Sequence, residues 1–129
     1  MVPGVRFCGA YITPSSSPYF SEAEIAQLQA RSTDENTNYV IVGDLNSRFG
    51  SKVCELTKKG EKMRYNPVDQ SLNDNGKKIL QICEDNELFV VNNLQTEFKR
   101  FSSALTYRMR KKWISELDVC IESKDLIQM

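Results

Sequence analysis

The spacing of apolar residues along the chain predicts a mixture of strands and helices. Five short runs are rich in aromatic and β-branched residues, and they are either apolar throughout or alternate with polar positions. Continuous runs are typical of strands buried on both faces, whereas alternating runs indicate strands with one exposed face. The five predicted strands cover Arg6 to Ile12, Tyr39 to Val42, Leu88 to Val91, Leu105 to Met109 and Glu116 to Ile121.

A first helix is predicted between the first two strands. Ile25 and Leu28, three positions apart, would place an apolar stripe on one face of a helix from Glu22 to Ala30. Ser21 and Glu24 have the spacing of a capping box, in which each side chain accepts a hydrogen bond from the backbone of the other residue. We therefore expect Ser21 to be the residue at which the helix begins.

A second helix is predicted from Lys77 to Asn86, because Ile79, Leu80 and Cys83 would share one of its faces. The stretch from Asn46 to Leu72 is polar, and glycine and proline interrupt any periodicity in it. We expect one long irregular loop there, of a length that usually carries function or mobility. The order of strand, helix, strand, loop, helix and three strands predicts an α/β fold in one domain that spans residues 1–129.

Composition limits the range of functions. Hydrophobic residues make up 40% and charged residues 26% of the 129 residues, which is typical of a packed globular domain. The 17 basic and 17 acidic residues cancel, so any surface that attracts nucleic acid must be local. No apolar stretch has the length of a membrane span, and we expect no membrane partner.

Histidine is absent from the sequence, which excludes Ser-His-Asp and Cys-His catalysis by residues of this chain alone. The four cysteines, Cys8, Cys54, Cys83 and Cys120, are far apart and form no C-x-x-C pair. We expect reduced thiols, three of them in apolar runs, and an intracellular location, the nucleus included.

A candidate for phosphoryl chemistry lies where the second predicted strand ends. Gly43-Asp44-Leu45-Asn46 combines a glycine, which permits close backbone approach, with a carboxylate and an amide two positions apart. The carboxylate suits a general base for water or a place in a magnesium shell, and the amide suits a water or a phosphate oxygen. A plain strand-end turn is the alternative, because glycine, aspartate and asparagine are common turn formers.

Four segments, in the same order along the chain, resemble motifs of the endonuclease/exonuclease/phosphatase superfamily. The tetrapeptide at Asp44 resembles the G-D-x-N motif, and the stretch Ala10 to Pro14, with Ser17 and Phe20, resembles the Y-x-P segment. The stretch Asn75 to Leu80, with Cys83, Leu88, Val90 and Asn92, resembles the N-G-x-x-L segment. The stretches Leu105 to Tyr107 and Ser115 to Asp118 resemble the paired T-(W/F/Y) and S-x-(I/L)-D segments. The most similar branch is the endonuclease domain of non-long-terminal-repeat, LINE-type retrotransposons.

The resemblance implies a fold and an activity. The fold would be part of a four-layer, DNase I-like α/β sandwich with mixed sheets flanked by helices. The activity would be phosphodiester hydrolysis with magnesium or manganese as cofactor, which nicks DNA and leaves a 3′-hydroxyl. The catalytic residues would be Asp44 as general base, Asn46 holding the phosphate or water, Tyr11 donating a hydrogen bond to the phosphate, and Asp118 orienting a histidine.

The sequence departs from the family pattern at two places. It lacks the acid-base histidine that follows the position of Asp118 in an S-D-H segment, and it lacks the metal-binding glutamate and the asparagine that precede the Y-x-P segment. The chain therefore resembles the middle and later part of a longer domain, and no residue is assigned as a metal ligand. The alternative function is a catalytically dead nucleic-acid-binding or interaction module. A small nucleotide-binding domain is disfavoured by the lack of a G-x-x-x-x-G-K loop.

A basic segment between Thr106 and Ser115 is predicted to form a hairpin tip that includes Trp113. Retrotransposon endonucleases carry a DNA-contacting hairpin in the corresponding stretch, so the resemblance implies contact with a nucleic-acid backbone or a base. A solvated edge hairpin, protected from strand pairing by its charges, is the alternative. The predicted substrate-binding residues are Thr106, Arg108, Arg110, Lys111 and Ser115.

Overall fold

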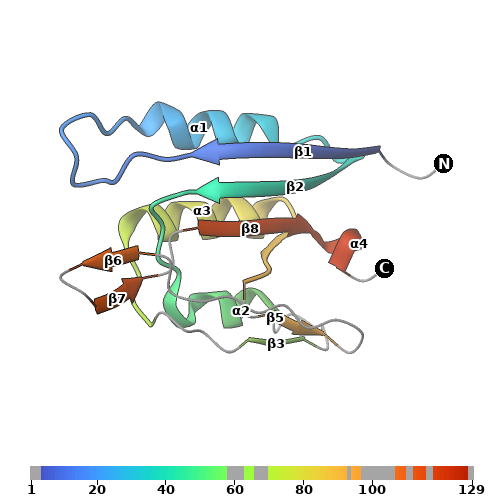
Figure 1. The fold of residues 1–129 in the computed structure, drawn as a ribbon. Helices are drawn as coiled ribbons and strands as arrows, with labels where there is room; N and C mark the ends of the chain where they lie inside the picture. The colour runs from blue at the N-terminus through green and yellow to red at the C-terminus, as the bar shows by residue number, and fades with distance from the viewer. Residues whose placement is uncertain are drawn as a thin grey trace.

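A four-stranded mixed sheet forms the centre of the fold (Figure 1). The computed structural model describes residues 4–57, 63–65, 70–92, 94–96, 107–109, 112–115 and 118–127. The strands of this sheet lie in the order β1-β2-β8-β4. Their bounds are Gly4–Tyr11 for β1, Thr37–Asp44 for β2, Asp118–Ser123 for β8 and Leu88–Val90 for β4.

Strand direction in this sheet follows from how the strands are connected. β1 and β2 are parallel, which requires a crossover connection, and helix α1 (Glu22–Arg31) provides it. β8 is antiparallel to both β2 and β4. Ile41, Ile121 and Val90 lie directly opposite one another on these three strands and are all buried. The predicted α/β class with a mixed sheet is confirmed.

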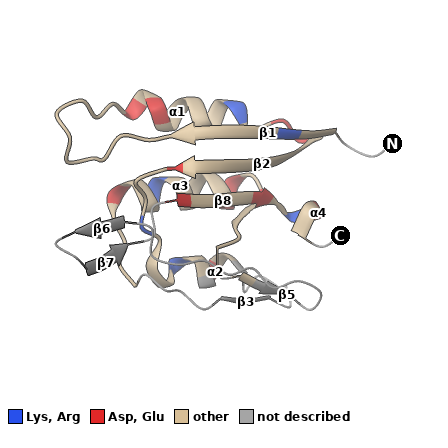
Figure 2. Ribbon diagram, in the orientation of Figure 1, with Lys and Arg blue, Asp and Glu red and all other residues tan. Residues whose placement is uncertain are grey.

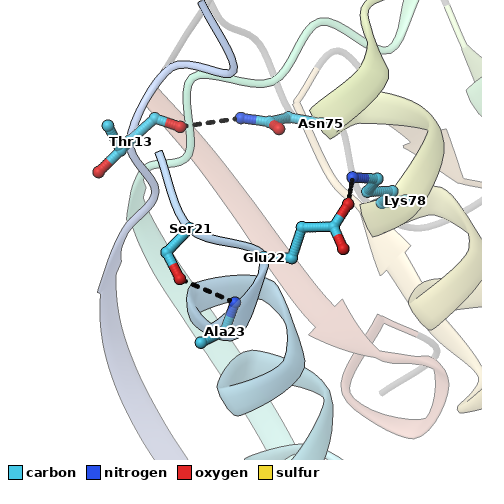
Figure 3. Close-up of polar contacts among 6 residues, drawn as sticks. All are labelled: Thr13, Ser21, Glu22, Ala23, Asn75 and Lys78. Atoms are coloured by element: carbon cyan, nitrogen blue, oxygen red, sulfur yellow. Dashed lines mark hydrogen bonds and ion pairs between the residues drawn. The ribbon is translucent and has the colours of Figure 1, made fainter. Parts of the chain in front are cut away.

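Two helices, α1 and α3 (Asp74–Asp85), cover the same face of the sheet (Figure 1). The ammonium group of Lys78 on α3 lies 2.8 Å from a carboxylate oxygen of Glu22 on α1 and lowers the pKa of that carboxyl group (Figure 3). No helix among the described residues is long and apolar enough to cross a membrane. The two predicted helices are confirmed, and their buried residues include Ile25, Leu28, Ile79, Ile82 and Cys83.

The opposite face of the sheet, called the outer face below, is open over β1 and β2. Alternate side chains of these strands point to opposite faces, and those on the outer face remain exposed. Over β4 the outer face is closed, because Phe89 is buried there and α2 (Val53–Thr57) contacts the strand. The exposed apolar residues on the outer face are Val5, Phe7, Tyr11 and Val42.

The start of α1 corrects the predicted capping box. The Ser21 hydroxyl accepts a hydrogen bond from the backbone N–H of Ala23 at 3.3 Å, so Ser21 is the N-cap as expected (Figure 3). The Glu24 carboxylate, however, accepts hydrogen bonds from the backbone N–H and the hydroxyl of Thr13, at 2.8 and 2.9 Å. The side chain that would have closed the box instead fixes the loop that follows β1.

The stretch predicted as one irregular loop contains regular structure, so that prediction was wrong in part. A 3-10 turn, η1 (Gly50–Lys52), leads into α2, and β3 (Met63–Tyr65) pairs antiparallel with β5 (Leu94–Thr96). Val53 and Leu56, three positions apart, are buried on one side of α2. Their spacing was the signal for this helix, and the surrounding polar residues obscured it.

The C-terminal strands differ from the prediction in their partners. β6 (Tyr107–Met109) pairs antiparallel with β7 (Lys112–Ser115), so the basic segment forms a hairpin. The predicted strand from Glu116 to Ile121 is not the partner of β6, because β8 begins at Asp118 and joins the central sheet. Trp113 lies within β7, opposite Arg108, rather than at the tip. A short helix, α4 (Lys124–Ile127), follows β8.

The thiols of Cys83 and Cys120 are not activated as nucleophiles. Cys83 is fully buried in α3, and burial raises the pKa of its thiol to about 12. Burial also raises the pKa of the Cys120 thiol, and the neighbouring Glu122 carboxylate adds to this effect. Because the thiolate is the reactive form, these two thiols serve as small apolar side chains.

Gly43 controls how closely β1 and β2 approach. Its φ is +154°, and a Cβ at this position would overlap the backbone carbonyl group of Ala10 on β1. We predict that Gly43→Ala lowers the free energy of unfolding by about 2–4 kcal/mol, because it adds both a steric overlap and backbone strain.

The matched control is Gly9→Ala on β1, where a Cβ would meet no atom within 4 Å. This variant should change the free energy of unfolding by no more than about 0.5 kcal/mol in chemical denaturation. Equal stability of the two variants would show that Gly43 does not limit the approach of the strands.

Candidate active site

Three of the four predicted catalytic residues lie side by side at one end of the central sheet. Tyr11 is opposite Asp44 in the parallel ladder of β1 and β2, and Asp44 is opposite Asp118 in the antiparallel ladder of β2 and β8. Figure 2 shows acidic positions at these neighbouring ends of β2 and β8. Directly opposite residues point to the same face of a sheet. Tyr11, Asp44 and Asp118 therefore form a row on the outer face, called the Asp44 row below.

Asn46, the fourth predicted catalytic residue, joins the ends of β1 and β2. Its backbone N–H donates to an Asp44 carboxylate oxygen at 3.1 Å, and its side-chain amide donates to the Ile12 carbonyl oxygen at 2.7 Å. Its φ is +45°, a left-handed conformation that asparagine tolerates better than most residues. The predicted strand-end turn is therefore present, and it holds the Asp44 carboxylate at the row, whereas the role of this carboxylate in phosphoryl chemistry stays a prediction.

Asn73, which the sequence prediction missed, fixes the chain just after Asn46. Its side-chain oxygen accepts from the backbone N–H of Gly76 at 2.8 Å and of Arg48 at 2.9 Å. Its side-chain nitrogen donates to the Asn46 carbonyl oxygen at 3.1 Å. Asn73 is thus the N-cap of α3 and also an anchor for the Asn46 turn. A signal was present, because asparagine is a preferred N-cap residue, but the helix was predicted to begin later, at Lys77.

Asn92 performs a similar task at the beginning of β8. Its side-chain nitrogen donates to the Asp118 carbonyl oxygen at 3.0 Å, and its side-chain oxygen accepts from the Cys120 N–H at 2.8 Å. These bonds fix the backbone on both sides of Val119, where β8 enters the sheet. Asn92 belongs to a segment with family resemblance, but its role at Asp118 follows only from the fold.

The Asp44 row lies on an open surface. Tyr11 is 62% exposed, Asp118 is exposed, and Asp44 and Asn46 are half-buried. A cavity of about 500 Å³ lies at the other end of the sheet, lined by residues from the start of β2 and the end of β8. The row is open and does not enclose a small ligand. It therefore suits a long, extended substrate better than a small one.

Two neighbouring carboxylates give the row a local negative charge. Like charges directly opposite on adjacent strands destabilise a sheet unless a cation or a proton separates them. Among the described residues, no group of three or more histidine, cysteine, aspartate or glutamate side chains is placed to hold a metal ion. Asp44 and Asp118 by themselves do not make a metal centre, so we assign no chemical step to a metal.

Two of the five predicted substrate-binding residues lie in the described strands β6 and β7. Arg108 is in β6 and Ser115 is the last residue of β7, while Thr106, Arg110 and Lys111 lie outside the described residues. Figure 1 shows this hairpin at the end of the sheet where β1 and β2 end and β8 begins. The described strands β6 and β7 therefore lie at the same end of the sheet as the Asp44 row.

No family model, no curated protein and no solved structure matches the chain. Membership of the endonuclease/exonuclease/phosphatase superfamily therefore stays a prediction based on the four motif-like segments.

We predict that Asn73→Ala lowers the free energy of unfolding by about 2–3 kcal/mol, because three hydrogen bonds, including the helix cap, are lost. Asn73→Asp is the matched control. It keeps both accepted bonds and loses only the bond donated to Asn46, so it should cost about 1 kcal/mol. Denaturant titration of both variants measures the difference. An alanine variant as stable as the aspartate variant would contradict a capping role.

Proposed function

We propose that the chain forms part of a nuclease site that hydrolyses phosphodiesters, with DNA as the substrate inside the cell. The observation that carries this proposal is the Asp44 row. Tyr11 and Asp118 flank Asp44 on adjacent strands, although they are 33 and 74 positions away from it in the sequence. A plain turn would give Asp44 a local role but no such neighbours.

In this proposal Asp44 accepts a proton from the attacking water, and its hydrogen bond from the Asn46 backbone orients the carboxylate. The exposed Tyr11 hydroxyl donates a hydrogen bond to a phosphate oxygen. The water oxygen bonds to phosphorus as the bond from phosphorus to the 3′-oxygen breaks, which leaves a 3′-hydroxyl after protonation. In the family that this chain resembles, a histidine oriented by the residue matching Asp118 supplies this last proton. Because this sequence contains no histidine, the leaving 3′-oxygen here takes its proton from solvent water.

We also propose that the domain has the four-layer, DNase I-like architecture. The supporting observation is the outer face, where Phe7 is 77% exposed and Val5 and Val42 are nearly half exposed. In a four-layer sandwich the two sheets pack face to face through such apolar residues, with helices on the outside. The helices α1 and α3 already cover the other face here.

A second candidate function is binding of nucleic acid without cleavage. The observation that favours it is the absence of histidine from the sequence, because the family that this chain resembles uses histidine for acid-base chemistry. The basic hairpin would still support binding in that case. Cleavage and binding assays on the same protein separate the two candidates.

The nuclease function predicts that the purified chain nicks supercoiled plasmid in the presence of magnesium or manganese, the cofactor of the family that it resembles, and that chelation by EDTA stops the reaction. Asp44→Asn should reduce the rate about 100-fold or more, because it removes the proton acceptor. The control, Asp125→Asn, makes the same chemical change on exposed α4 at the opposite end of β8 and should leave the rate unchanged.

Equal nicking by the protein and its Asp44→Asn variant would reject the assigned role of Asp44. An intact plasmid that is retarded on a gel would support the binding module instead. Neither nicking nor retardation would reject both candidates.

We predict that Arg110→Ala combined with Lys111→Ala weakens DNA binding and lowers the slope of log affinity against log salt by about 2, one for each lost phosphate contact. Lys52→Ala combined with Lys77→Ala removes the same charge from exposed positions on η1 and α3 and should leave the slope unchanged. Fluorescence anisotropy over a range of salt concentrations measures both. The same slope for both double variants would reject a role for the basic hairpin.

A further inference from the structure

Thr13, where the chain leaves β1, has all three of its polar groups held by the two helices. Its backbone N–H and its hydroxyl donate to the two carboxylate oxygens of Glu24 on α1, at 2.8 and 2.9 Å. Its carbonyl oxygen accepts from the side-chain amide of Asn75 on α3, at 3.2 Å (Figure 3). Tertiary contacts therefore fix this residue from two sides. These three residues are called the Thr13 clamp below.

Asn75 is held in the clamp at a cost to stability. Its side chain is fully buried, and its side-chain oxygen has no hydrogen-bond partner among the described residues. A buried amide with an unpaired oxygen destabilises the folded state relative to an apolar side chain of similar size. Such conflicts are expected where a residue is retained for function rather than for stability. The bond to Thr13 is what this amide provides.

The clamp lies two positions after Tyr11 of the Asp44 row. The residue between them, Ile12, is buried, and its N–H donates to the Asp44 carbonyl oxygen at 3.0 Å. Its own carbonyl oxygen accepts from the Asn46 side chain. The end of β1 is thus bonded at each step from Ile12 to Thr13. Because the Tyr11 hydroxyl is at the far end of its ring, a small rotation of this backbone would displace the hydroxyl by a larger distance.

We propose that the Thr13 clamp positions the Tyr11 hydroxyl for its hydrogen bond to the phosphate. This inference rests on the proposed function, because only that function gives Tyr11 a phosphate to meet. The clamp residues do not touch the substrate. They fix the backbone from which the Tyr11 side chain extends, so they are positioning residues. Helices α1 and α3, which cover one face of the sheet, thereby act on the row that lies on the other face.

The first test is the rate of plasmid nicking by the full chain. Thr13→Val removes the hydroxyl bond to Glu24 and keeps the shape of the side chain. We expect kcat to fall about tenfold with KM unchanged, because the contact that is misplaced acts in the chemical step. Thr13→Ser keeps the hydroxyl and should retain at least about half of the wild-type kcat. The matched control is Thr37→Val, which removes a hydroxyl bond to the carboxylate of Asp34 at the other end of the sheet and should leave kcat unchanged.

A double-variant cycle separates positioning of Tyr11 from a general structural role. In a Tyr11→Phe background, which lacks the hydroxyl, Thr13→Val should lower kcat by less than about twofold. The same tenfold loss with and without the Tyr11 hydroxyl would overturn the proposal. Full activity of Thr13→Val in the wild-type background would overturn it as well.

Amide hydrogen exchange tests the clamp without relying on cleavage. Thr13→Val should speed exchange of the Ile12 N–H about tenfold, through local opening at the end of β1, and leave the Ile41 N–H in the middle of β2 unchanged. If the wild-type chain does not nick DNA, the nuclease function fails on that result alone, and the exchange rate of Ile12 still decides about the clamp. Faster exchange supports a clamp that fixes the strand end, and unchanged exchange overturns it.

Discussion

The pairing of β2 with its two neighbours is the constraint on which both the core and the candidate site depend. Gly43 lets β2 approach the carbonyl group of Ala10, and the next position along the same ladder places Asp44 beside Tyr11. On the other side of β2, the register that aligns the buried Ile41 and Ile121 also aligns Asp44 with Asp118. A slip of one residue would bury Asp44 and expose Ile41, because side chains alternate between faces. Core packing therefore selects the register that assembles the Asp44 row.

Asparagine side chains then fix the chain where regular pairing ends. Asn46 bonds the Ile12 carbonyl, Asn73 bonds the Asn46 turn, and Asn92 bonds both sides of the beginning of β8. Asn75 donates to the Thr13 carbonyl oxygen at 3.2 Å (Figure 3), although its own side-chain oxygen is buried without a partner among the described residues. An amide can satisfy a carbonyl and an N–H at once, so it replaces the ladder bonds that loops lack. The end of the sheet that carries the Asp44 row is thereby held by long-range contacts.

The interior of each element was predictable from sequence, and its partners were not. Continuous apolar runs identified β2 and β4, but the predicted burial on both faces is correct only for β4, because Val42 of β2 is exposed on the open outer face. The polar residues Thr37 and Asn38 hid the true start of β2. Asp44 and Asn46 stand out through a local motif. Their alignment with Asp118 depends on strand order, which no local pattern encodes. The bond from Glu24 to Thr13 was missed for the same reason: a nearby capping partner was assumed where a distant one was available.

Electrostatics separates the two tasks, binding and cleavage, that the proposed function requires. The proposed function sets the Asp44 carboxylate beside an anionic phosphodiester, and like charges repel each other. The chain has no net positive charge to compensate at long range. In the proposed function, the attraction therefore comes from cations elsewhere, and the described strands of the basic hairpin, β6 and β7, lie at the same end of the sheet (Figure 1). In the proposed function, affinity and chemistry therefore reside in different residues, so a change at Asp44 would remove the proposed proton acceptor and leave the basic residues proposed to bind nucleic acid in place.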